Sequence, residues 1–286
     1  MLVILLAFAL QFLAYYLSIG RSAYFFDALS VCAVVLVTLS ALSLRGLFYS
    51  RMIGVTFLIA CWGGRLSSHL FDRAEKDTKN VAHEQSHINY VVARALWTLA
   101  VSACPIFLNL AYDYGIHPGL FRQPEDIFLV LLALMSIGLE WWADQSKKKW
   151  HDAVTRETQD FCRVGPWAWS RHPNYFAEVC FHLCIYGLSA RHVPFVCVFG
   201  ALMNVYVCIF TKGGVLGLER RRFNATPYNK VLMEYRRTVS AFFPIPPSLY
   251  RHVPFSIRRA FFMDWRMFSK VEEIKLEMLP ISTSGV

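Results

Sequence analysis

The chain has 286 residues, of which 56% are hydrophobic and only 17% are charged, and its formal net charge is +9. Soluble domains carry charge on about a quarter of their residues. The composition therefore excludes an ordinary soluble globular domain and favours a protein whose helices lie in a lipid bilayer.

Seven apolar stretches follow one another along the chain. They are residues 1–19, 24–44, 52–70, 96–112, 127–143, 176–190 and 193–211. Their lengths approach what a hydrocarbon core of about 30 Å requires, and backbone that faces lipid cannot be irregular. The sequence predicts an all-α bundle of about seven transmembrane helices, whose first span is retained rather than cleaved. We expect residues 1–247 to form one integral membrane domain and residues 248–286 to form a basic, aromatic tail on the membrane surface.

Lysine and arginine are unevenly distributed over the connections between these spans. With the N-terminus outside, 25 of the 29 fall on the cytosolic side, as the positive-inside rule expects. We therefore predict a cytosolic C-terminus, and we ascribe the net charge to topology and anionic lipid headgroups rather than to nucleic acid. The eight cysteines lie mostly in or beside the spans and include no Cys-x-x-Cys pair. We predict neither a metal site nor a disulfide framework.

The sharpest chemical signal lies where the sixth span begins. Arg171 and His172 supply hydrogen-bond donors, and Pro173 stiffens the turn before the helix. Asn174 and Glu178 are four residues apart and therefore share one helix face. Arginine binds phosphate or carboxylate with its planar fork, and a carboxylate one turn into a span is a functional candidate by default. The alternative is an interfacial cap, in which Arg171 extends to the headgroups and Glu178 pairs with a neighbour.

Two further polar groups lie near the cytosolic ends of the later spans. Glu140 and Asp144 are four residues apart, so both carboxylates project from one face of the fifth span. They either accept hydrogen bonds from the ribose and amide groups of a ligand or pair with arginine across the bundle. Residues 219–222 and 235–238 combine basic side chains with tyrosine, a pattern that suits a phosphorylated cofactor or, equally, a phospholipid surface.

Taken in order, these groups resemble the DUF1295 family, which groups with the steroid 5-alpha-reductase and sterol-reductase superfamily. The resemblance rests on residues 138–145, 163–178 and 218–247, together with residues 62–66 and Arg73 further upstream. It implies a membrane reductase that takes a hydride from NADPH and reduces a C=C bond in a lipid or steroid-like substrate. By analogy with the family, the endoplasmic reticulum is the expected location.

The resemblance also implies roles for individual residues. Tyr175, Glu178 and Glu140 are the candidates for a proton donor or carbonyl polariser. The cofactor cradle would comprise Asp144, Gln145, Arg163, Arg171, His172, Asn174, Glu219, Tyr228, Tyr235 and Arg236. No Gly-x-Gly-x-x-Gly segment follows a strand, so no soluble nucleotide-binding domain is implied.

Two other functions fit some of the same residues. The order Arg-His-Pro-x-Tyr, followed by a glutamate, is also similar to that of isoprenylcysteine carboxyl methyltransferases, which share the membrane fold and use S-adenosylmethionine. A non-catalytic lipid-binding scaffold is supported by Ala177, which stands where the family commonly has glycine, and by the basic tail. The complete ordered set, including residues 140–145, favours the reductase.

Overall fold

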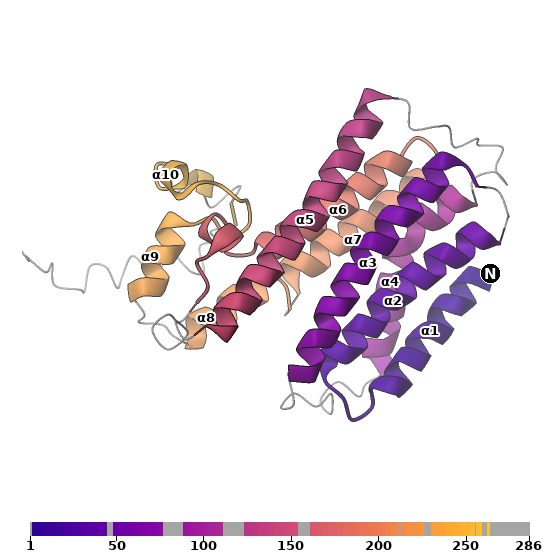
Figure 1. Ribbon diagram of the computed structural model, residues 1–286, viewed down its shortest axis with the longest axis horizontal. Coiled ribbons are helices and arrows are strands. Elements are labelled where there is room, and N and C mark those ends of the chain that lie inside the picture. Colours follow the sequence, from indigo (N-terminus) through magenta and orange to yellow (C-terminus); the bar gives the residue numbers. More distant parts are fainter. Residues whose placement is uncertain are drawn as a thin grey trace, which may run out of the picture. The chain divides into compact units, whose positions relative to one another are not determined.

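The computed structural model describes residues 2–44, 48–76, 88–110, 123–153, 161–211, 213–225, 230–254, 256–258 and 262–263. Its helices, drawn in Figure 1, are α1 (Leu2–Ser18), α2 (Ala23–Ser43), α3 (Ser50–Lys76), α4 (Ile88–Asn109), α5 (Pro124–Asp152), α6 (Pro173–Ser189), α7 (Val198–Phe210), α8 (Val215–Ala225), α9 (Lys230–Thr238) and α10 (Pro247–Tyr250). Two short 3-10 helices, η4 (Gly165–Ala168) and η5 (Phe195–Cys197), precede α6 and α7.

Each of the seven predicted spans overlaps one of the helices α1 to α7, so the predicted all-α class is confirmed. Helix α4 begins eight residues before its predicted start at residue 96, and α7 begins five residues after its predicted start at residue 193. Four stretches within the described residues are long and apolar enough to cross a membrane: Ala23–Ser43, Val91–Asn109, Pro124–Asp152 and Phe195–Arg222. Helix α1 is a shorter apolar helix. Helix α5 continues beyond its predicted end at residue 143, because residues 144–152 contain no glycine or proline that would stop it. The chain is a helical membrane protein.

The described part of the predicted surface tail is short. Helix α10 and a helical turn at residues 256–258 are present, and residues 264–286 lie outside the described residues. Pro244 and Pro246 lie between α9 and α10, as expected of residues that lack a backbone donor, and Pro247 begins α10, where the missing donor costs nothing.

The chain divides into two compact units. The first unit contains residues 1–138 and 178–206, and the second contains residues 139–177 and 207–286. In the first unit α2 packs against α1, α3 and α4. Figure 1 shows α2 between α1 and α3. A Cβ atom on Gly63 would lie only 2.3 Å from Val35 Cγ2, so α3 approaches α2 closely because this position has no side chain.

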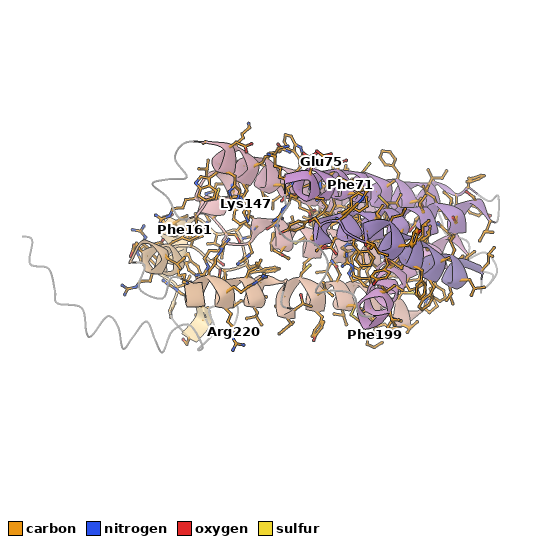
Figure 2. The ribbon with its side chains drawn as sticks, turned by 90° about the horizontal axis from the view of Figure 1, so that it is seen from below. Phe71, Glu75, Lys147, Phe161, Phe199 and Arg220 are labelled. Carbon is orange, nitrogen blue, oxygen red and sulfur yellow. The ribbon has the colours of Figure 1, made fainter. Side chains whose placement is uncertain are left out.

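Large apolar side chains also cover the outside of the first unit. Phe199 of α7, which points outward in Figure 2, is 61% exposed, and Phe57 of α3 is exposed to the same extent. Exposed apolar surface of this kind is unfavourable in water. It is expected of helices that contact lipid.

Polar side chains hydrogen-bond between helices inside the first unit. Gln11 of α1 is fully buried, donates to Thr98 Oγ1 at 2.7 Å and accepts from Ser30 Oγ at 3.0 Å. Arg51 of α3 donates to both carboxylate oxygens of Asp126 on α5, at 2.8 and 2.6 Å, and to the Leu188 carbonyl of α6 at 3.0 Å. Such interhelical bonds fix the helix pairing in an apolar surrounding.

Candidate functional site in the second unit

The segment that leads into α6 is anchored to the end of α5. Gly165 begins η4 with φ +62°, a left-handed conformation that favours glycine, and a Cβ atom there would lie 2.8 Å from Ser146 Oγ. Trp167 donates its indole N–H to the Ala143 carbonyl at 2.8 Å. Gly165 and Trp167 therefore determine where the following residues, Arg171 to Tyr175, enter the second unit.

A second segment, residues 240–245, holds the same loop from the other side, and we call it the strap. Arg171 N donates to the Ser240 carbonyl at 2.9 Å, Ser170 Oγ to the Phe242 carbonyl at 2.8 Å and Ile245 N to the Trp169 carbonyl at 3.1 Å. No role was predicted for the strap. Its only local signal is the proline-rich stretch that ends it, which prevents a helix and leaves an extended backbone.

Glu219 of α8 lies at the centre of a buried charge cluster. Its Oε1 accepts a hydrogen bond from His172 Nε2 at 2.9 Å, and its Oε2 lies 3.6 Å from Arg171 Nη2 and 3.3 Å from Arg236 Nη2. Arg236 Nη2 also donates to the Glu219 backbone carbonyl at 3.1 Å. All four side chains are at most 5% exposed. We call these four residues the Glu219 cluster; it joins the residues before α6 to α8 and α9.

This burial decides between the two interpretations of Arg171. Its side chain does not extend to headgroups, and the prediction of an interfacial cap is wrong in that respect. Burial lowers the pKa of His172 to about 4, while its hydrogen bond to Glu219 acts in the opposite direction. The imidazole is therefore neutral at pH 7. Because a carboxylate only accepts, the proton must be on Nε2.

Tyr235 and Arg163 lie together in an aromatic stack. The Tyr235 ring stacks on Phe161 with centroids 4.9 Å apart, and the Arg163 guanidinium lies 4.6 Å from the Phe161 centroid and 5.2 Å from that of Tyr235. Tyr235 donates its hydroxyl to the Trp167 carbonyl at 2.5 Å, and burial raises its pKa. Its phenol is thus neutral and fixes the loop rather than meeting solvent.

Tyr175 and Asn174 occupy the first turn of α6. Tyr175 donates its hydroxyl to the Gly213 carbonyl at 2.6 Å, and its ring meets the His172 ring at a centroid distance of 5.9 Å. The Asn174 oxygen Oδ1 is buried and has no hydrogen-bond partner within the described part of the chain. A buried acceptor without a partner is rare, and it is the acceptor that a ligand would satisfy.

The remaining predicted residues are distributed differently. Glu140 and Asp144 are buried one turn apart on α5, and Gln145 beside them is half-buried. Glu178 belongs to the first unit, whereas the other described candidates belong to the second. Tyr228 lies outside the described residues.

The structure thus unites Arg171, His172, Glu219 and Arg236 in direct contact. Tyr235 and Arg163 join them through the Trp167 loop, and Tyr175 through the His172 ring.

Comparison with known proteins gives one family. Residues 17–239 match the family described as "Protein of unknown function (DUF1295)". No curated protein and no solved structure matches the chain. The match spans more than three quarters of the chain and includes most of the residues just described, although the strap lies just beyond its end. The resemblance inferred from the ordered motifs is confirmed: the chain belongs to the DUF1295 family.

Proposed function

We propose that the chain is a membrane-embedded oxidoreductase that uses NADPH to reduce a C=C bond in a lipid or steroid-like substrate. The observation that carries the proposal is the buried Glu219 cluster followed, two residues after His172, by the Asn174 oxygen, which has no hydrogen-bond partner among the described residues. A buried acceptor beside such a cluster suits a polar ligand. Family membership and the superfamily relation inferred from the motifs favour the reduction of a lipid.

The residues of the second unit fit a nucleotide cofactor. Asn174 Oδ1 can accept from the carboxamide or a ribose hydroxyl of NADPH. Three exposed arginines follow the buried cluster residues in sequence: Arg220 and Arg221 come after Glu219 on α8, and Arg237 comes after Arg236 on α9. Their guanidinium groups are suited to the phosphates of NADPH. Arg220 is labelled in Figure 2. In this proposal the Glu219 cluster positions the start of α6 and the two helices, while the bound cofactor supplies the hydride.

Three side chains are candidates for the proton that completes the reduction. Tyr175, Glu140 and Glu178 can each donate a proton or polarise a substrate carbonyl. Tyr175 is the candidate we favour, because its ring contacts His172 and its hydroxyl is held in place by the Gly213 carbonyl. Asp144, Gln145 and Tyr228 complete the proposed cofactor cradle.

The proposal includes a topology of seven spans, with the N-terminus outside and the C-terminus in the cytosol of an endoplasmic reticulum membrane. All seven predicted spans are helical, and the positive-inside distribution favours this orientation. The Glu219 cluster would then face the compartment that contains NADPH. The substrate would enter from the bilayer.

NADPH binding tests this function in the purified full chain in detergent. We expect saturating NADPH to raise the unfolding temperature, and we expect Asn174→Ala to weaken binding about tenfold, the effect of one lost hydrogen bond. Without NADPH the variant should unfold at nearly the wild-type temperature, because Asn174 Oδ1 has no partner to lose within the described part of the chain.

S-adenosylmethionine is the competitor that separates the two enzyme functions. If the chain is a reductase, excess S-adenosylmethionine should not displace NADPH. Stabilisation by S-adenosylmethionine alone would instead identify a methyltransferase, and stabilisation by neither compound would leave the lipid-binding scaffold. Arg191→Gln serves as a control for nonspecific charge effects, because this exposed arginine belongs to the first unit, pairs with Glu125 and is not one of the proposed cradle residues.

A further inference from the structure

A buried aromatic pair in the first unit has no part in the proposed cofactor site. Trp62 lies near the middle of α3 and is fully buried, and His182 lies near the middle of α6 and is 4% exposed. Their ring centroids are 4.7 Å apart with an interplanar angle of 82°. Phe181 stacks on the Trp62 ring with centroids 5.6 Å apart, and its ring meets the His182 ring edge-on at a centroid distance of 5.2 Å.

Each of the two side chains carries a buried polar atom for which the described residues offer no hydrogen-bond partner. Trp62 Nε1 and His182 Nε2 are buried, and neither has a hydrogen-bond partner among the residues that the structure describes. Buried polar groups are nearly always paired, and the requirement is stricter in an apolar membrane interior, where no bulk water can satisfy them. Two such atoms on facing rings of two different helices therefore indicate a place prepared for a polar atom of a ligand.

We propose that Trp62 and His182 bind the oxygen atom of an otherwise apolar ligand, such as a long-chain alcohol. The indole N–H can only donate, whereas His182 Nε2 accepts or donates according to its tautomer. A hydroxyl oxygen can accept from Trp62 while its hydrogen is donated to His182. A carbonyl oxygen can accept from both. The inference does not rest on the proposed reductase.

The surroundings match a ligand with one polar end. The two nitrogens lie among apolar side chains such as Phe181, which is itself fully buried. Because both rings are buried, the ligand oxygen must replace the edge contact between them. Such a contact is a weak interaction compared with two ordinary hydrogen bonds. The replacement is therefore favourable once the hydrocarbon part is accommodated.

Photolabelling in lipid nanodiscs tests this inference without NADPH. The probe is a hexadecanol that carries a diazirine, and the labelled peptides are identified by mass spectrometry. We expect labelling in α3 or α6 near Trp62 and His182, with competition by hexadecanol but not by hexadecane. In Trp62→Phe, which keeps an aromatic ring but removes the N–H, labelling should fall at least tenfold. The unfolding temperature without ligand should also fall, because phenylalanine leaves a cavity where the fully buried indole lay.

Trp97→Phe is the matched control, because the Trp97 indole N–H already donates to Asn204 Oδ1, at 3.4 Å. This variant should lower the unfolding temperature and leave labelling intact. Equal competition by hexadecane, or labelling that survives in Trp62→Phe, would overturn the inference. Failure of NADPH to bind would refute the proposed reductase but leave the lipid site untouched.

Discussion

Glu219→Gln is expected to lower the free energy of unfolding by about 3–5 kcal/mol, the usual effect of removing one partner from a buried ion pair. The substitution preserves the shape of the side chain but removes the negative charge that faces Arg171 and Arg236. All of these groups are buried, so water cannot replace the lost interaction. Reversible denaturant unfolding in detergent micelles measures the effect.

Glu125→Gln is the matched control for this prediction. Glu125 also pairs with an arginine, Arg191, but both side chains are exposed, at 48% and 63%. Exposed ion pairs contribute little to stability because water screens them, so the control should unfold like the wild type. If Glu219→Gln behaved like Glu125→Gln, the Glu219 cluster would not hold the start of α6, α8 and α9 together.

Asp126→Asn should produce a loss of similar size, about 3–5 kcal/mol, in the first unit. Arg51 donates to both oxygens of Asp126 and to the Leu188 carbonyl, so the change leaves a buried guanidinium facing a neutral amide. The same unfolding measurement applies. The partly exposed pair between Arg94 and Asp27 provides the comparison, and Asp27→Asn should cost about 1 kcal/mol or less.

A double substitution distinguishes the ion pair from a general packing effect. Replacing both partners by apolar residues, as in Arg51→Met with Asp126→Leu, removes the buried charges together. Such replacements are often neutral or stabilising, so the double variant should be more stable than Asp126→Asn alone. A double variant that lost at least the sum of the single losses would contradict this account.

The sequence predicted the helices well because their signal is local. Each apolar stretch is long enough to specify a span by itself, and α1 to α7 lie where the stretches lie. The four-residue spacing of Glu140 and Asp144 likewise placed both on one face of α5, where both are buried. Arg171 and His172 were singled out by their residue chemistry, and the family resemblance added Glu219 and Arg236 as cofactor-site residues; the structure brings these four together.

Their pairing could not be predicted. Glu219 was grouped with three following arginines as a basic surface, yet its carboxylate meets His172, 47 residues earlier in the chain, and Arg236 on α9. Such contacts depend on how α8 and α9 pack against the start of α6. Helical periodicity predicts which residues share a face of one helix, but it does not predict which helices meet. The strap was not predicted for a related reason. It contributes only backbone atoms to its bonds with the Arg171 loop, and every residue type has the same backbone carbonyl, so the sequence does not reveal these bonds. Trp62 entered the sequence analysis only as part of the family motif at residues 62–66, and no role was predicted for His182; the contact between their rings became apparent only in the structure.

Transfer of deuterium from NADPH to lipid tests the central claim most directly. Vesicles that contain the full chain and total membrane lipid would receive NADPH labelled with deuterium at its transferable position, and the lipids would be analysed by mass spectrometry. The account predicts a lipid that gains one deuterium from the cofactor and one hydrogen from water, with an equal amount of NADP⁺ formed. This product should be strongly reduced in Asn174→Ala. Wild-type vesicles that bind NADPH but transfer no deuterium to any lipid would contradict the proposed reductase.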